Sequence, residues 1–149
     1  MAQFGARLAA QLRAGDLVAL NGALGAGKTT LTRGLGAELG VHGSVTSPTF
    51  VLARTHRRID AGPPLVHVDA YRLGSAAELD DLDIDWQASI VVVEWAAGML
   101  DGVTDQWLEI TIERPTGGGE QIVAGDEPVE PRILTVTGHG ERWRDLRLV

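Results

Sequence analysis

Eight consecutive residues constrain this chain more than any other part of its sequence. They are Gly22-Ala23-Leu24-Gly25-Ala26-Gly27-Lys28-Thr29, which fit the pattern G-x-x-x-x-G-K-[ST] without deviation. An apolar run at 17–20 precedes them, and leucines at helical spacing follow from Leu31 to Leu39. A glycine-rich loop between a strand and a helix is the setting in which this pattern binds phosphate. The chain therefore has to fold so that one strand ends beside the start of a helix.

Each residue type in the pattern has a physical role in binding phosphate. Glycines allow backbone N–H groups to converge on phosphate oxygens, and the start of a helix adds a partial positive charge. Lys28 supplies a mobile cation, and Thr29 supplies a hydroxyl that can bind Mg²⁺. Lys28 is also the single lysine among 13 basic residues. The alternative is an ordinary glycine turn with an incidental lysine, which the full match to the pattern disfavours.

The hydrophobic pattern of the remaining chain predicts strands that alternate with helices. We expect a helix that contains Phe4, Leu8 and Leu12 and stops at Gly15, and a second helix at 31–39. We also expect a short acidic helix near 75–82, buried strands at 17–20, 65–68 and 90–93, and half-buried strands at 107–113 and 133–137. The segment 50–53 is expected to be extended, 54–64 to be a charged turn, and 117–131 to be the least ordered stretch. The sequence thus predicts a single α/β domain over residues 1–149, P-loop NTPase-like, with a central, largely parallel (mixed) β-sheet flanked by helices. The two C-terminal strands are expected to extend one edge of the sheet as an antiparallel pair.

Composition narrows the classes of protein to which the chain can belong. With 44% hydrophobic and 22% charged residues it has the make-up of a folded domain. A formal charge of −7 argues against holding nucleic acid on a broad cationic face. The absence of cysteine excludes disulfides and thiolate metal sites. No apolar run approaches the length of about 20 residues that a membrane span needs, so we expect a soluble protein, in the cytoplasm by default.

Two carboxylates follow buried-strand patterns directly. Asp69 comes after the run at 65–68, and Glu94 comes after the run at 90–93. Because the carboxyl ends of parallel strands meet at one edge of a sheet, we expect both acids to lie beside the glycine-rich loop. One would hold Mg²⁺ and the other would position an attacking group, and periodicity alone does not assign the two roles. The alternative for either acid is a surface residue that merely ends a strand.

Other charged residues are weaker candidates for a site. The acidic cluster Glu78, Asp80, Asp81, Asp83 and Asp85 is interpreted as a solvated helix face rather than a metal site. His67 alternates with apolar neighbours, which favours a core or strand histidine over a ligand. Arg72 fits a phosphate clamp and a surface salt bridge about equally.

Four short motifs occur in an order that is more specific than the glycine-rich loop alone. They are the segment from Gly22 to Thr30, then Ser47-Pro48-Thr49-Phe50, then His67-Val68-Asp69-Ala70-Tyr71-Arg72-Leu73, and then Val93-Glu94-Trp95. In this order, and in a chain of this length, they resemble the bacterial TsaE (YjeE) family. The resemblance covers nearly the whole chain, from the first predicted helix to the strand that begins at Trp107.

The resemblance implies a small P-loop ATPase with a central sheet flanked by helices. The family works with TsaB and TsaD in making threonylcarbamoyladenosine in transfer RNA, beside the anticodon of ANN-reading tRNAs. ATP and Mg²⁺ are the implied cofactors, and hydrolysis, which is expected to be slow without the partners, resets the complex. We expect tRNA to be reached indirectly, through the complex, because the chain has little diffuse positive charge.

The resemblance also implies a role for individual residues. Lys28, Thr49 and Asp69 would serve hydrolysis, with Thr49 near the γ-phosphate. Thr29 and Glu94 would ligate Mg²⁺, which resolves the ambiguity between the two acids. The nucleotide-binding set comprises Gly22, Ala23, Leu24, Gly25, Ala26, Gly27, Lys28, Thr29, Thr30 and Trp95.

The chain departs from the family pattern at two places. The family usually has Asp where this chain has Ala23, and Gly117 to Pro131 is an apparent insertion. Rival interpretations are a small-molecule P-loop kinase, with Arg54, Arg57 and Arg58 as its candidate lid, and a nucleotide-binding adaptor with little turnover. The same arginines could instead meet an acidic partner surface. A regulatory GTPase is excluded, because its N-K-x-D motif needs a second lysine.

Overall fold

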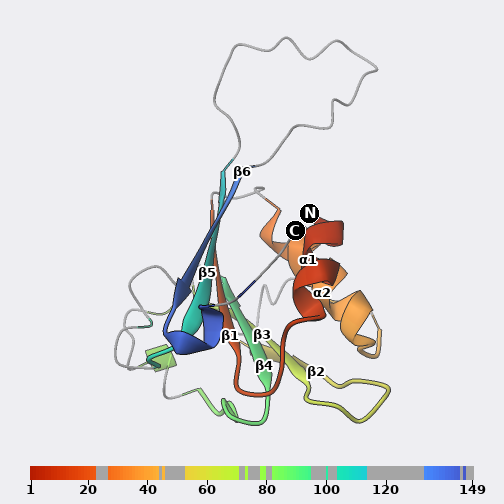
Figure 1. Ribbon diagram of the computed structural model, residues 1–149. Helices are drawn as coiled ribbons and strands as arrows, with labels where there is room; N and C mark the ends of the chain where they lie inside the picture. The colour runs from red at the N-terminus through yellow and green to blue at the C-terminus, as the bar shows by residue number, and fades with distance from the viewer. Residues whose placement is uncertain are drawn as a thin grey trace, which may run out of the picture.

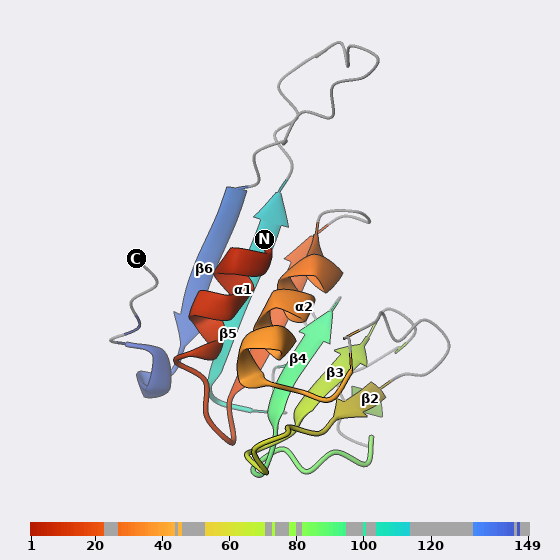
Figure 2. The same cartoon turned by 90° about the vertical axis from the view of Figure 1, so that its right-hand side faces the viewer.

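The chain forms one six-stranded mixed sheet with two helices on one face (Figures 1 and 2). The computed structural model spans residues 1–149 and describes residues 1–22, 27–43, 45, 53–70, 73, 78–79, 82–94, 100, 104–113, 133–144 and 146. The elements are α1 (Ala2–Ala9), β1 (Leu17–Gly22), α2 (Lys28–Leu39), β2 (Ala53–His56), β3 (Leu65–Asp69), β4 (Ile90–Glu94), β5 (Trp107–Glu113), β6 (Ile133–His139) and the 3₁₀ helix η1 (Glu141–Trp143).

The strand order places β1 near the middle of the sheet. The order is β2-β3-β4-β1-β5-β6, with β3, β4, β1 and β5 parallel to one another. The two outer strands, β2 and β6, are antiparallel to their neighbours. This arrangement confirms the predicted α/β class, the largely parallel sheet and the antiparallel pair at its C-terminal edge. The end of β1, at Gly22, thus lies in the sheet between β4 and β5.

Both helices cover the same face of the sheet (Figure 2). Leu8 from α1 and Leu31 and Leu35 from α2 are fully buried against the inward side chains of the strands. The two helices approach closely at Gly34. A Cβ added there would lie 2.1 Å from the carbonyl oxygen of Ala2. Only glycine fits such a contact. None of the helices in the described part of the chain is long and apolar enough to cross a membrane.

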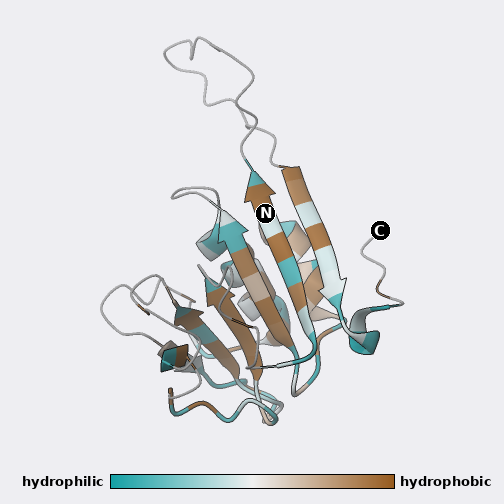
Figure 3. Cartoon of the chain, turned by 90° about the vertical axis from the view of Figure 1, so that its left-hand side faces the viewer, coloured by the Kyte–Doolittle hydropathy of each residue, from teal (hydrophilic) through white to brown (hydrophobic). Residues whose placement is uncertain are grey.

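The opposite face of the sheet has two different halves (Figure 3). A second apolar cluster, which includes Leu79 and Leu100, packs on β1, β3 and β4. Strands β5 and β6 instead alternate between hydrophobic and polar residues along their length. Their alternation is the half-buried pattern that the sequence predicts for them.

One edge strand corrects the sequence interpretation. Residues 54–56 were expected to belong to a charged turn, but they form β2, which pairs antiparallel with β3. Arg54 and Thr55 are exposed whereas His56 is buried. A strand at the edge of a sheet buries few side chains, so its polar sequence resembles that of a turn. Helix α1 also ends earlier than expected, at Ala9. Residues 50–52 and 117–131 lie outside the described residues, and of the predicted acidic helix only Glu78 and Leu79 are described as helical.

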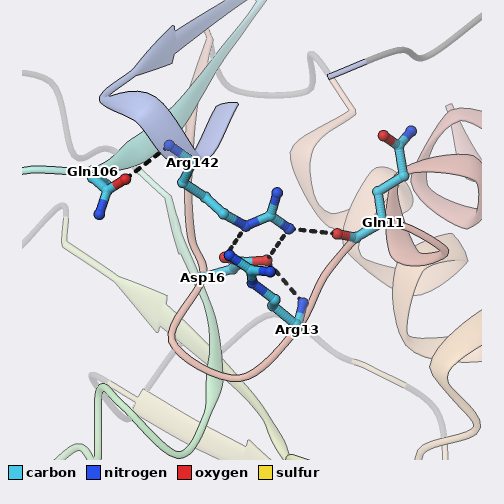
Figure 4. Close-up of polar contacts among 5 residues, drawn as sticks. All are labelled: Gln11, Arg13, Asp16, Gln106 and Arg142. Atoms are coloured by element: carbon cyan, nitrogen blue, oxygen red, sulfur yellow. Dashed lines mark hydrogen bonds and ion pairs between the residues drawn. The ribbon is translucent and has the colours of Figure 1, made fainter. Parts of the chain in front are cut away.

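A partly buried ion pair joins the C-terminal 3₁₀ helix to the start of β1 (Figure 4). Arg142 donates from Nε to Asp16 Oδ1 at 3.0 Å and from Nη2 to Asp16 Oδ2 at 2.9 Å. Nη2 also donates to the carbonyl oxygen of Gln11 at 2.7 Å, and the backbone N–H of Arg142 donates to Gln106 Oε1 at 2.8 Å. The backbone N–H of Arg13 donates to Asp16 Oδ2 at 2.8 Å. These contacts join three segments at the end of the sheet where β1 begins.

Candidate functional site

Helix α2 begins directly after the segment that fits the glycine-rich pattern. Gly27 precedes the helix with φ of 113°, a left-handed conformation that favours glycine. Lys28 is the first residue of α2, and Thr29 and Thr30 follow it in the first turn. Residues 23–26 lie outside the described residues. The helix start, whose first backbone N–H groups have no partner within the helix itself, therefore lies after the end of β1 where the sequence predicts phosphate binding.

Lys28 is buried, with 5% of its surface exposed. Its Nζ donates to the carbonyl oxygen of Gly22 at 2.7 Å, which holds the ammonium beside the end of β1. Burial lowers the pKa of Lys28 below its ordinary value, and the nearby Glu94 and Asp69 carboxylates offset part of this shift. The cation is thus placed between the end of β1 and two acids.

The two predicted acids end neighbouring strands in register. Asp69 is the last residue of β3, Glu94 is the last residue of β4, and the two are paired across the strands. The backbone N–H of Ala70 donates to the carbonyl oxygen of Glu94 at 2.9 Å, which extends the pairing by one residue. Glu94 is 5% exposed, and Asp69 is half-buried. The structure therefore brings Lys28, Asp69 and Glu94 to one edge of the sheet, as their positions in the sequence predict.

A third polar side chain, His67, contacts Glu94. His67 Nε2 lies 2.5 Å from Glu94 Oε2, and the histidine is completely buried. It is in β3 opposite Val92 of β4, on the same sheet face as Asp69 and Glu94. The sequence correctly predicted a strand histidine, but it did not reveal the contact with Glu94. The alternation of His67 with Asp69 was the available signal, since it puts both side chains on one face.

A second buried histidine lies on the adjacent edge strand. His56 is 8% exposed, and its Nε2 has no hydrogen-bond partner among the described residues. Burial is the main cause that lowers the pKa of His56, and the electrostatic influence of nearby His67 and Arg54 adds to it. The sequence analysis did not single out His56, because it falls within the predicted turn.

Several predicted site residues lie outside the described part of the chain. They are Ala23, Leu24, Gly25, Ala26, Thr49, Arg72 and Trp95. In the acidic cluster, the described members Glu78, Asp83 and Asp85 are exposed, as expected of a solvated face. Arg54 and Arg57 are exposed, whereas Arg58 forms an ion pair with Asp60 at 2.7 Å.

The described residues contain no group of three or more metal-ligating carboxylate or imidazole side chains. At this edge of the sheet the carboxylate of Glu94 is buried, and the hydroxyl-bearing residues Thr29 and Thr30 lie in the first turn of α2. Mg²⁺ is commonly bound by one or two protein oxygens together with substrate phosphates and water. The residues present therefore fit Mg²⁺ bound with a nucleotide better than a metal ion held by protein alone.

Comparison with known proteins decides the family. Residues 1–122 match the sequence model of the family described as "Threonylcarbamoyl adenosine biosynthesis protein TsaE". The chain belongs to the TsaE family. The family resemblance drawn from the four motifs is thereby confirmed, together with the family's role in threonylcarbamoyladenosine biosynthesis.

Relatives support this assignment over most of the chain. The tRNA threonylcarbamoyladenosine biosynthesis protein TsaE of Streptomyces coelicolor is 56% identical over 146 residues, which cover 96% of this chain and 93% of that protein. TsaE of Bacillus subtilis is 36% identical over 141 residues, covering 93% and 79% of the two chains. The crystal structure of Bacillus subtilis YdiB matches with a TM-score of 0.68 and 30% identity, over 95% of this chain and 80% of that one. This TsaE-family chain therefore resembles proteins named TsaE in sequence and YdiB in fold.

Proposed function

We propose that this TsaE-family protein binds and hydrolyses ATP with Mg²⁺, and that it acts with TsaB and TsaD in the threonylcarbamoyladenosine modification of tRNA. One observation carries the proposal of ATP hydrolysis. It is the convergence of the buried Lys28 ammonium and the Asp69 and Glu94 carboxylates at the start of α2.

The charges at this edge of the sheet favour a nucleotide that carries a divalent cation. Two carboxylates outnumber the one ammonium group, so bare ATP would meet net repulsion from Asp69 and Glu94. Burial of Lys28 and Glu94 strengthens these interactions by excluding water. The site therefore favours Mg²⁺ and ATP together over ATP alone.

Each residue has a distinct role in the proposed hydrolysis. Lys28 binds the β- and γ-phosphates, while Thr29 and Glu94 hold the metal ion. When bound, Mg²⁺ would offset part of the negative charge of the phosphates. Asp69 orients a water molecule, and the oxygen of this water attacks the γ-phosphorus. The Asp69 carboxylate accepts the proton that the water releases. The bond between the γ-phosphorus and its bridging oxygen breaks, giving ADP and inorganic phosphate.

The first experiment measures ATP binding by calorimetry with and without Mg²⁺. Lys28→Ala removes a charge-assisted contact worth roughly 1.5–3 kcal/mol and should weaken ATP binding about 10- to 150-fold. Arg144→Ala is a matched loss of positive charge at a side chain that is 73% exposed, and it should leave affinity unchanged. GTP should bind more weakly than ATP, because the chain has no guanine-reading N-K-x-D motif. Unchanged affinity in Lys28→Ala, or tighter binding of GTP, would contradict the proposal.

A second experiment separates the roles of the two acids. Glu94→Ala should weaken Mg²⁺-dependent binding and turnover together, because it removes a metal ligand. Asp69→Asn should reduce turnover more than binding, because it changes a group that acts on water. A Mg²⁺ titration with the reverse pattern would exchange the two assignments.

A third experiment tests the partners. A pull-down with TsaB and TsaD, with and without ATP, should show an ATP-dependent complex. A gel shift of tRNA at physiological salt should show weak binding by this chain alone, since it carries a formal charge of −7. Hydrolysis measured with and without the partners distinguishes an enzyme from a nucleotide-binding adaptor. Tight tRNA binding by the isolated chain, or no association in any nucleotide state, would contradict this part of the proposal.

A further inference from the structure

The contact between His67 and Glu94 fixes one oxygen of the acid that we propose as a metal ligand. The 2.5 Å distance joins His67 Nε2 to Glu94 Oε2. No hydrogen bond within the described residues engages the other oxygen, Oε1. With 0% and 6% of their side chains exposed, the two partners interact with almost no competition from water.

The backbone makes this contact a consequence of strand register. His67 pairs with Val92, and Asp69 pairs with Glu94, between parallel strands β3 and β4. The histidine therefore lies two residues further into the sheet than Glu94, on the same face. From this position its ring reaches the carboxylate from the side of the core, opposite to the edge where the nucleotide is proposed to bind.

The direction of the hydrogen bond follows from the chemistry of the two groups. An ionised carboxylate can only accept, so Nε2 of His67 carries the proton and donates. Nδ1 of His67 is buried without a hydrogen-bond partner among the described residues. A neutral ring with its proton on Nε2 avoids burying a second N–H group that has no acceptor there. We assign this tautomer to His67.

We propose that His67 is a positioning residue, which holds Glu94 by Oε2 so that Oε1 is directed toward Mg²⁺. This inference rests on the proposed function of the site. A glutamate side chain that is ordered in advance loses less conformational entropy when it binds a metal ion. Groups that orient metal ligands in this way typically change metal affinity by 10- to 100-fold when they are replaced.

His56 provides a matched control for this role. It is also a buried histidine, and its position opposite Leu65 places it on the same sheet face as His67. Its Nε2 has no hydrogen-bond partner in the described part of the chain, so it does not hold Glu94 as His67 does. Replacing His56 thus tests the loss of a buried imidazole without the loss of the carboxylate contact.

The experiment compares four variants by the Mg²⁺ concentration at which ATP binding is half-maximal. His67→Leu removes the donor, and His67→Asn keeps a polar side chain that is too short to reach Glu94. His67→Gln retains a donor near the original Nε2 position, and His56→Leu is the control. Far-UV circular dichroism and urea unfolding without nucleotide establish that each variant folds, and His67→Asn carries the test if His67→Leu does not fold.

We expect His67→Leu and His67→Asn to raise the Mg²⁺ midpoint about 10- to 100-fold, with rescue to within about fivefold in His67→Gln. His56→Leu should change it less than about twofold, even where its stability falls. Long-range ¹H–¹⁵N spectra of the wild-type protein should show His67 with its proton on Nε2. An unchanged midpoint in the two loss variants, or an equal rise in His56→Leu, would overturn the inference while leaving the proposed function intact. A wild-type protein whose ATP binding does not depend on Mg²⁺ would overturn both.

Discussion

Removing the guanidinium of Arg142 should destabilise the fold far from the candidate site. In Arg142→Ala, the Asp16 side chain keeps the backbone N–H of Arg13 as a donor but loses both hydrogen bonds from the guanidinium. The carbonyl oxygen of Gln11 also loses its bond to Nη2. Asp16 remains buried, with only 4% of its side chain exposed, so its charge is left poorly compensated.

The magnitude follows from the burial of the two partners. Breaking a fully buried ion pair by removing one partner typically costs about 3–5 kcal/mol. The Arg142 side chain is 19% exposed and Asp16 retains one donor, which reduces the expected loss to roughly 2–4 kcal/mol. In a domain of this size each kcal/mol shifts the midpoint of thermal unfolding by about 2–4 °C, so we expect a fall of roughly 5–15 °C.

Urea unfolding followed by circular dichroism measures this loss directly. Arg144→Ala is the control, because Arg144 lies two residues further on and its ion pair with Glu141 is long, at 3.8 Å, and largely exposed. That variant should change the free energy of unfolding by less than about 0.5 kcal/mol. If Arg142→Ala falls within the same range as Arg144→Ala, the buried pair does not contribute as the geometry indicates.

Two further variants test packing and titration. Gly34→Ala puts a Cβ 2.1 Å from the carbonyl oxygen of Ala2. Urea unfolding should therefore show a free energy of unfolding lower by roughly 1–3 kcal/mol, despite the higher helix propensity of alanine. A gain in stability would contradict the close approach of α1 and α2. The pKa of His56 is lowered in the folded chain, so the unfolded chain binds a proton near the ordinary imidazole pKa of 6.5 whereas the folded chain does so only at lower pH. The free energy of unfolding should therefore fall as the pH drops from 7 to 5, by at most about 1.4 kcal/mol per pH unit. His56→Gln should flatten that dependence, and an unchanged slope would show that His56 does not cause it.

The central strands and the first turn of α2 could be predicted because their sequence patterns have a single physical interpretation. Four consecutive apolar residues at 90–93 fit a strand buried on both faces, and the structure has β4 there. Strand β2 could not be predicted in the same way. At an edge, pairing with β3 supplies the hydrogen bonds, and the exposed side chains of Arg54 and Thr55 resemble those of a turn.

The candidate site could be predicted in part for a related reason. Asp69 and Glu94 stand at the ends of recognisable strands, and parallel strands bring their ends together, so their proximity follows from the pattern alone. The contact between His67 and Glu94 depends on the register of β3 against β4 and on the orientation of two side chains. Neither is encoded in the periodicity of a single strand, because the register is set by packing across the whole sheet.

The position of β1 in the sheet has a consequence for the protein during its synthesis. Leu17–Gly22 is made early, but it pairs only with Ile90–Glu94 and Trp107–Glu113, which leave the ribosome much later. Until then, the strand that precedes the glycine-rich segment has neither of its neighbours, and Lys28 has no Glu94 beside it. Contacts between such distant segments form slowly, because a long loop must close before they stabilise the chain. A nascent chain that ends before residue 90 therefore leaves the backbone of β1 unpaired and its apolar side chains exposed, and it cannot assemble the site. At this stage of synthesis the chain is most prone to aggregate and most dependent on chaperones.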